Sequence, residues 1–328
     1  MSSFTEAWLP GPGPKALSFY TRTYHPPSGS PRGVVVFIHG FIEHVTRYEY
    51  VHKRWADHGF VVFTFDQRGF GRTALDQKRS PGSVYGRTCD ADQISDIAWA
   101  LRVAQEANPT VPLFLMGHSM GGGLVLSFAM RANTQDSVSQ LSGIIASSPC
   151  ILLTKPQGAI TRWLSSRVRS VLPNQNIPVS VEPKVRRCSL FPSVPTRNSA
   201  WTTQHLSHDP AVVKDNETDQ LIRRSASLRA IDDMLNRGEN LAKDYKNWPT
   251  ALPVLVVHGT EDKVCSVEAA KLFVDRLPAS DKNISLYEGG YHELQNEPDG
   301  VKEKFVDECV EWANAHFPIA SDATQARL

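Results

Sequence analysis

The sequence is poor in cysteine and has none of the long apolar stretches that cross a membrane. Its five cysteines are odd in number and scattered without a C-x-x-C pair, which argues against a disulfide framework and against a zinc site. No apolar run approaches the roughly 20 residues that span a bilayer, since even the run from Val34 to Ile38 has only strand length. We therefore expect no metal, no cofactor, no membrane span and a reducing, intracellular compartment.

The charge pattern and the two chain ends bear on partners and location. The net charge is +1 and no long basic stretch is present, so the sequence offers no source for the counterion release that drives nucleic-acid binding. The first residues lack a basic start followed by an apolar segment, so we expect neither a secretory signal nor an anchor. The last three, Ala326-Arg327-Leu328, have the small-basic-leucine form of the peroxisomal signal S-K-L, which leaves a peroxisomal location open beside a cytosolic one.

Short apolar runs alternate with helical patterns along the 328 residues, and 41% of the residues are hydrophobic, enough to form a sizeable core. This alternation predicts an α/β fold with a mostly parallel sheet and helices on both faces. Amphipathic spacing predicts helices over Asp90–Ala107 and 301–316. The expected parallel strands are residues 34–39, 60–65, 113–117, 143–147, 254–258 and 284–288, with an antiparallel edge strand at 17–24.

One long stretch, residues 150–248, interrupts the alternation because it is rich in Pro, Ser and Arg and has no clear strand pattern. We expect a lid inserted there between two parts of one core, 1–149 and 249–318, with a flexible tail over 319–328. Apolar residues of the lid fall near one helical stripe flanked by arginines, which favours either contact with a lipid surface or packing on the core. The stripe consists of Ile160, Trp163, Leu164, Val168 and Val171.

A single segment has the pattern of an activated serine. The apolar strand over 113–117 is followed by G-x-S-x-G around Ser119 and then by an apolar helical pattern, the order of a nucleophile elbow. The glycines fit because a side chain at either flanking position would collide with neighbouring backbone at this strained turn. The alternative is an ordinary glycine-rich turn; we predict that Ser119 is the nucleophile.

A serine hydroxyl needs a base and a carboxylate that orients the base, in the order Ser, Asp or Glu, His for this fold class. Asp262 lies in the loop after one expected strand, with Glu261 as the nearest competitor. His292 lies in the loop after the next strand, and among 11 histidines it alone follows the acid in the required position. His39 and His258 stand at strand ends beside glycines, where structural roles in turns fit equally well.

Acyl transfer also needs two amides that stabilise the developing oxyanion. Met120, directly after the nucleophile, supplies one, and the Phe41 amide in the loop after the strand at 34–39 supplies the other. The alternative for the Phe41 loop is a plain strand-ending turn.

Five motifs occur in sequence: HGFIEHVTRYEY, FDQRGFGRT, GHSMGGG, HGTEDKV and EGGYHEL. In this order they resemble the monoacylglycerol lipases, most closely the fungal ones, which are α/β-hydrolases with an inserted lid. The resemblance implies that the chain cleaves monoacylglycerols to fatty acid and glycerol through an acyl-enzyme. With such a substrate, the apolar stripe of the lid favours contact with membranes or lipid droplets as one of its two interpretations. It also implies that Glu43, Arg47 and His118 lie near the pocket for the glycerol part; a buried ion pair and a core histidine are the alternative.

Two departures from the family leave the substrate open. The lipases usually carry glycine two positions after His39-Gly40, where this chain has Ile42, and the lid sequence matches poorly. A lysophospholipase or another carboxylesterase with the same three residues is therefore an alternative. A ligand-binding receptor or scaffold with this fold is a non-enzymatic one.

Overall fold

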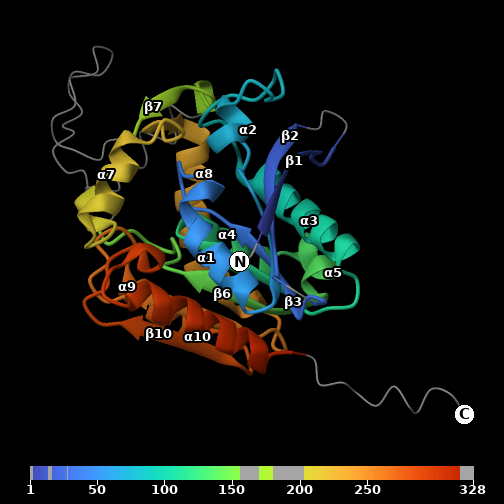
Figure 1. Ribbon diagram of the computed structural model, residues 1–328. Helices are drawn as coiled ribbons and strands as arrows, with labels where there is room; N and C mark the ends of the chain where they lie inside the picture. Colours follow the sequence, from blue (N-terminus) through green and yellow to red (C-terminus); the bar gives the residue numbers. More distant parts are fainter. Residues whose placement is uncertain (1–2, 14–16, 28, 156–169, 180–202, 318–328) are drawn as a thin grey trace, which may run out of the picture.

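An eight-stranded sheet forms the centre of the molecule (Figure 1). This computed structural model describes residues 3–13, 17–27, 29–155, 170–179 and 203–317. The strand order is β1-β2-β4-β3-β5-β6-β9-β10, in which β1, β2 and β4 pair antiparallel and the other neighbours pair parallel. The strands are β1 Ser3–Pro10, β2 Ser18–His25, β3 Gly33–Ile38, β4 Phe60–Phe65, β5 Leu113–His118, β6 Leu141–Ser147, β9 Val254–Gly259 and β10 Lys282–Tyr287.

All six predicted parallel strands are present with ends shifted by one or two residues, and β2 is the predicted antiparallel edge strand. The prediction missed β1, which lies outside β2 and takes over the edge position. Most of its side chains are exposed, so its sequence has no apolar alternation to reveal it. The mostly parallel α/β sheet is confirmed.

Alternate residues of the central strands face opposite layers of helices. On β3, Val34 and Val36 join the core beneath one layer, and Val35 and Phe37 join the core beneath the other. The first layer consists of α3 Asp90–Ala107, α4 Met120–Ala129, α8 Leu228–Asp244 and α9 Val267–Arg276. The second consists of α1 Glu49–Asp57 and α10 Val301–Ala315. Both strongly amphipathic helices predicted from the sequence are therefore present, the second ending one residue early.

Short elements complete the described chain. They are the 3-10 helices η1 Val45–Tyr48, η2 Ala132–Thr134, η3 Thr203–His205, η4 Tyr245–Asn247 and η5 Leu294–Asn296, the helices α2 Gly71–Leu75, α5 Gln135–Val138 and α7 Pro210–Thr218, and the strand pair β7 Asn176–Pro178 with β8 Ser225–Ser227. Figure 1 shows β7 and α7 on the upper left of the molecule, beside α8.

The predicted lid over 150–248 stays a proposal, and parts of this stretch pack on the core. Within it, α8 packs against α3 and α4, and Leu241 and Trp248 belong to the core cluster under the first helix layer. The polar composition of this stretch hid α8 because one side of that helix faces solvent. At the other end Ile151 is also part of the core.

Several predicted features fall outside the described residues. These are Ile160, Trp163, Leu164 and Val168 of the lid stripe, and the tail with Ala326-Arg327-Leu328. Among the residues that the structure does describe, no helix is both long and apolar enough to cross a membrane.

Candidate active site

Ser119 sits on a sharp turn between β5 and α4. Its φ of 54° and ψ of −116° lie outside the regions that L-residues normally adopt, so the turn is strained. A Cβ on Gly117 would lie 2.4 Å from the Gly121 carbonyl oxygen, and a Cβ on Gly121 would lie 2.1 Å from the Ile38 oxygen. Both positions of the G-x-S-x-G pattern therefore require glycine, and the turn presents the serine at the carboxyl end of the sheet.

The three predicted triad residues meet at this end of the sheet. His292 Nε2 lies 2.9 Å from Ser119 Oγ, and His292 Nδ1 lies 2.7 Å from Asp262 Oδ2. Asp262 follows β9 and His292 follows β10, and because these strands are parallel neighbours their following loops lie side by side. Glu261, the competitor for the acid, is instead within 3.8 Å of Lys263.

Asp262 is held by donors on both oxygens. Oδ1 accepts hydrogen bonds from the amides of Val264 at 2.7 Å and Cys265 at 2.9 Å, and Oδ2 lies 3.1 Å from His258 Nε2. Burial alone would raise the pKa of Asp262. The charge of His292 and the hydrogen bonds from His258 and His292 outweigh burial and hold that pKa well below its usual range. The Asp262 carboxylate is therefore ionised in the folded protein near neutral pH.

The Asp262 carboxylate changes the pKa of His292. Burial opposes protonation, but the charge of Asp262 and its hydrogen bond raise the pKa of His292 above its usual value. The Ser148 hydroxyl donates to the His292 carbonyl oxygen at 2.8 Å and fixes the backbone of the loop. With Nδ1–H directed at Asp262, Nε2 is the nitrogen that accepts from Ser119.

Two amides are free near the serine. Gly40 lies close to it, because a Cβ built on Gly40 would be 3.4 Å from Ser119 Cβ, so the Phe41 loop borders the nucleophile. Within the described part of the chain, neither the Phe41 nor the Met120 amide donates an intramolecular hydrogen bond. Ile42 has a φ of 55°, a left-handed conformation that a β-branched residue rarely adopts. Its backbone has the conformation that suits glycine, although its side chain is buried.

Glu43 and Arg47 lie together in a buried network, as in the buried ion pair that the sequence left open as an alternative, and Glu293, which was not predicted, joins them. Arg47 Nη2 lies 2.8 Å from both carboxylate oxygens of Glu293, while its Nε is 3.8 Å from Glu43 Oε1. Glu43 Oε2 accepts from the Gly40 amide at 3.1 Å and from the Tyr48 hydroxyl. The Arg47 and Glu293 positions are 246 residues apart, so no local pattern in the sequence could pair them.

His118 lies behind the catalytic imidazole. Its Nδ1 is 3.2 Å from Ser147 Oγ, and its ring centroid is 4.9 Å from that of His292. Burial and the neighbouring His292 keep the pKa of His118 well below its usual value. Among the described residues its Nε2 has no hydrogen-bond partner. A buried polar atom of this kind is expected to find a partner, here from a ligand or water.

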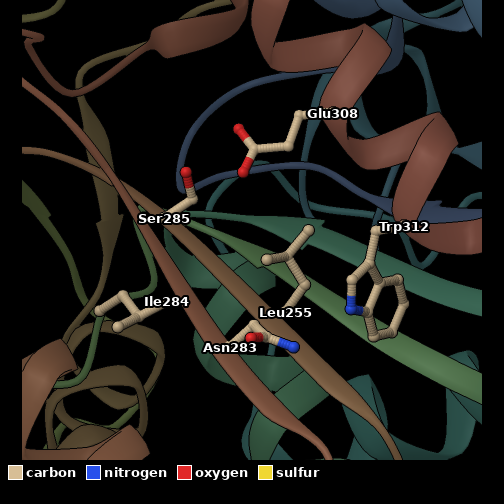
Figure 2. A pocket seen from close by; sticks show the side chains of 6 residues that line it. All are labelled: Leu255, Asn283, Ile284, Ser285, Glu308 and Trp312. Atoms are coloured by element: carbon tan, nitrogen blue, oxygen red, sulfur yellow. The ribbon is translucent and has the colours of Figure 1, made fainter.

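A separate pocket of about 380 Å³ lies between β10 and α10 (Figure 2). Figure 2 shows Glu308 and Trp312 of α10 on the same side of β10 as Asn283 and Ser285, whereas the Ile284 side chain points to the other side of the strand. The residues that line it include a serine hydroxyl but no histidine to activate that hydroxyl. None of the predicted site residues belongs to this pocket. Likewise, the described residues contain no group of three or more His, Cys, Asp or Glu arranged to hold a metal ion.

The sheet order and the two helix layers define an α/β-hydrolase. Residues 29–299 match the family described as serine aminopeptidase, S33, and the chain belongs to this family.

Individual relatives are similar over most of their length. A monoacylglycerol lipase of Mycolicibacterium smegmatis is 29% identical over 297 residues, covering 89% of this chain and 91% of the relative. A monoglyceride lipase of Saccharomyces cerevisiae is 29% identical over 303 residues, covering 87% and 85%. A solved structure of a soluble variant of the Saccharomyces cerevisiae monoglyceride lipase with a substrate analog superposes with a TM-score of 0.78, 24% identity and 96% coverage of both chains. At that identity the structural likeness supports the fold alone.

Proposed function

We propose that this chain is a serine carboxylic-ester hydrolase that cleaves monoacylglycerols to a free fatty acid and glycerol. The observation that carries the proposal is the continuous path Ser119 Oγ, His292 Nε2, His292 Nδ1 and Asp262 Oδ2, with contacts of 2.9 Å and 2.7 Å. Nucleophile and base within hydrogen-bond reach, with the base oriented by a buried acid, are the requirement for acyl transfer. The similarity to monoacylglycerol and monoglyceride lipases supports the choice of ester.

In the acylation half of the proposed reaction, Ser119 Oγ attacks the ester carbonyl carbon while His292 Nε2 takes the serine proton. Negative charge then develops on the carbonyl oxygen, where the free amides of Phe41 and Met120 donate hydrogen bonds. The intermediate collapses with cleavage of the bond to the glycerol oxygen, which receives the proton from His292. Glycerol leaves and the acyl group stays on Ser119.

In the deacylation half, water replaces glycerol. His292 accepts a proton from this water, whose oxygen attacks the acyl carbon and forms a second oxyanion at the same two amides. Collapse releases the fatty acid and returns the proton to Ser119 Oγ. The ionised Asp262 stabilises the imidazolium in both halves, which is why its pKa must lie far below that of His292.

For the alcohol part of the substrate we assign different roles to the three predicted contact residues. His118 Nε2 is buried without a partner in the described structure and is therefore available to a glycerol hydroxyl. Glu43 and Arg47 are already engaged with Tyr48, Gly40 and Glu293. Their proposed role is to form the polar wall of this subsite.

The enzyme assignment is tested with an active-site fluorophosphonate. The wild-type protein is expected to be labelled, and Ser119→Ala is expected to lose both labelling and ester hydrolysis. Labelling that persists in the Ala variant contradicts the nucleophile. The substrate is tested by comparing monoacylglycerols with di- and triacylglycerols and lysophospholipids; a preference for lysophospholipids replaces the substrate class while keeping the triad.

We further propose that the chain contacts membranes or lipid droplets through the predicted lid. Val171 is 78% exposed, Leu172 50% and Leu152 40%, and all three lie within the predicted lid. Exposed apolar residues in such a segment favour an interfacial contact. Liposome flotation is expected to weaken in V171S/L172S. The matched control is L272S/L286S, which changes two exposed leucines of α9 and β10; equal binding by both double variants contradicts the proposal.

Peroxisomal delivery by Ala326-Arg327-Leu328 remains a separate proposal. A fluorescent protein fused to the N-terminus is expected to mark peroxisomes and to lose that location when the tripeptide is deleted. An unchanged distribution contradicts it.

A further inference from the structure

A second histidine is bonded to the acid of the triad. His258, the next-to-last residue of β9, is fully buried, and its Nε2 lies 3.1 Å from Asp262 Oδ2 and 3.2 Å from the Cys265 carbonyl oxygen. Both neighbours are acceptors, so Nε2 carries the hydrogen. The Nδ1 atom has no partner among the described residues. His258 therefore directs its Nε2–H donor at the acid.

Packing alone does not explain an imidazole at this position. A buried nitrogen without a partner costs about 1–3 kcal/mol, a penalty that an apolar side chain of similar volume would avoid. The neighbouring residues of β9, Val256 and Val257, are apolar and fully buried. The position therefore keeps a polar group despite its cost, and among the described residues its contact with Asp262 is the one hydrogen bond of His258 to the proposed catalytic path.

We propose that His258 is a positioning residue that holds the Asp262 carboxylate in line with His292 and draws part of its negative charge away from the base. Asp262 Oδ2 then serves two imidazoles at 2.7 Å and 3.1 Å, while the Val264 and Cys265 amides occupy Oδ1. The four donors come from β9, from the loop after it and from the loop after β10, and together they restrain the orientation of the carboxylate. The inference rests on the proposed function, because it concerns the acid of that reaction.

Loss of the His258 donor is expected to raise the pKa of His292. The carboxylate charge would concentrate on the hydrogen bond to His292 Nδ1, which favours the imidazolium and raises the pKa of the base. The other charged or titratable groups that bear on His292 stay unchanged by this loss. They are Glu293 of its own loop, Glu43 of the β3 loop, His118 of β5 and Cys150 after β6, together with Arg47, which neutralises Glu293.

The test is the pH dependence of kcat/KM for monoacylglycerol hydrolysis in His258→Leu and His258→Gln. The Leu variant is expected to lose roughly 10- to 100-fold in kcat, with KM nearly unchanged, because the acid is no longer held in place. Its acid limb is expected to shift to higher pH by roughly 0.5–1 unit, the size expected when one charged hydrogen bond of a competing pair is lost. The Gln variant keeps an N–H donor on a side chain of similar reach. It is expected to retain most of the wild-type kcat and to leave the acid limb close to its wild-type pH.

The matched control is His52→Leu. His52 is also a fully buried histidine, and neither of its nitrogens has a partner among the described residues, but its neighbours are Tyr24, Phe37 and Tyr48 and not the acid. This control is expected to leave the pH profile in place. An acid limb that does not move in His258→Leu, or that moves equally in His52→Leu, overturns the proposal.

A measurement on the unaltered protein covers the case in which His258→Leu does not fold. With ¹⁵N-labelled histidine, His258 is expected to show the Nε2–H tautomer across neutral pH; an Nδ1–H tautomer overturns the proposal. Labelling of wild-type protein by the fluorophosphonate separates this outcome from failure of the function itself. A protein that is neither labelled nor active refutes the proposed function, whereas the tautomer still reports whether His258 Nε2 carries the hydrogen that the contact with Asp262 requires.

Discussion

Two clusters of buried charge flank His292, and they are built in opposite ways. On one side a single carboxylate, Asp262, receives four donors and leaves no oxygen open. On the other side Arg47 faces two carboxylates, Glu43 and Glu293, and its Nε lacks a hydrogen-bond partner among the described residues. The first cluster is complete without a ligand. The second has polar capacity left over, as does the neighbouring His118.

Under the proposed function, this end of the sheet serves two tasks. A catalytic acid must not move during the reaction, so its hydrogen bonds are filled in advance by the protein. A subsite for a polar alcohol must exchange partners, so some of its buried donors stay open until a substrate arrives. The pKa directions agree: that of Asp262 is lowered despite burial, whereas burial and the charge of Glu293 raise that of Glu43.

The largest expected effect comes from breaking the complete cluster at its centre. Asp262→Asn presents an amide NH₂ or a neutral oxygen to His292 Nδ1, so the imidazole loses the tautomer that the reaction needs. Loss of the analogous carboxylate in a serine protease lowers kcat by about 10⁴-fold, and we expect a similar loss here. The measurement is kcat for monoacylglycerol hydrolysis at neutral pH. A loss below tenfold contradicts the role of Asp262.

The next effect compares the two carboxylates that face Arg47. Glu293→Gln leaves the Arg47 guanidinium buried without the carboxylate that it contacts twice at 2.8 Å, and removal of one partner of a buried pair destabilises by about 3–5 kcal/mol. Glu43→Gln keeps a carbonyl oxygen for the Tyr48 and Gly40 donors. Its expected loss is about 1 kcal/mol. Urea unfolding of both variants is the measurement, and equal losses contradict the division of roles.

The pH dependence of stability separates the same two carboxylates further. The pKa of Glu43 is raised in the folded protein. Its contribution to the free energy of unfolding is therefore present below the unfolded pKa of 4.5 and is lost as pH rises through the folded pKa. The lowered pKa of Glu293, held down by Arg47 against burial, gives the reverse: its contribution is present above 4.5 and is lost as pH falls. From pH 5 to 8, Glu43→Gln is therefore expected to gain stability relative to wild type, whereas Glu293→Gln runs parallel to wild type over this range and gains relative to it only as pH falls below 4.5. Chemical unfolding at several pH values checks both signs.

The sequence predicted those features of the fold and the site that arise from residues close together in the chain. The elbow at Ser119 and the loops of Asp262 and His292 each follow a short apolar strand. Their motifs and order therefore predicted that the three side chains lie together, and the two hydrogen bonds join them. The parallel strands were likewise visible as apolar runs. Arg47 and Glu293 could not be paired, because the contact depends on the three-dimensional approach of two loops.

Three further features were not predicted from the sequence, each for its own reason. His258 looked like a turn histidine because its contact with Asp262 arises only when the loop after β9 folds back on the strand end. The helix α8 was assigned to the lid because composition reports the exposed face of a helix as strongly as the buried one. Exposed β1 had no alternation at all.

The smallest expected effect concerns the loop that carries one oxyanion amide. Ile42 is 5% exposed and has a φ of 55°, so its side chain is well packed while its backbone is strained. Ile42→Ala and Ile42→Gly remove nearly the same buried surface, but only glycine adopts this conformation freely, which favours the Gly variant by about 1–2 kcal/mol. In most positions alanine is the more stable of the two. Thermal unfolding is therefore expected to rank Gly above Ala here. The reverse order would mean that the loop relaxes away from positive φ in the variants, and the Phe41 amide would then move with it.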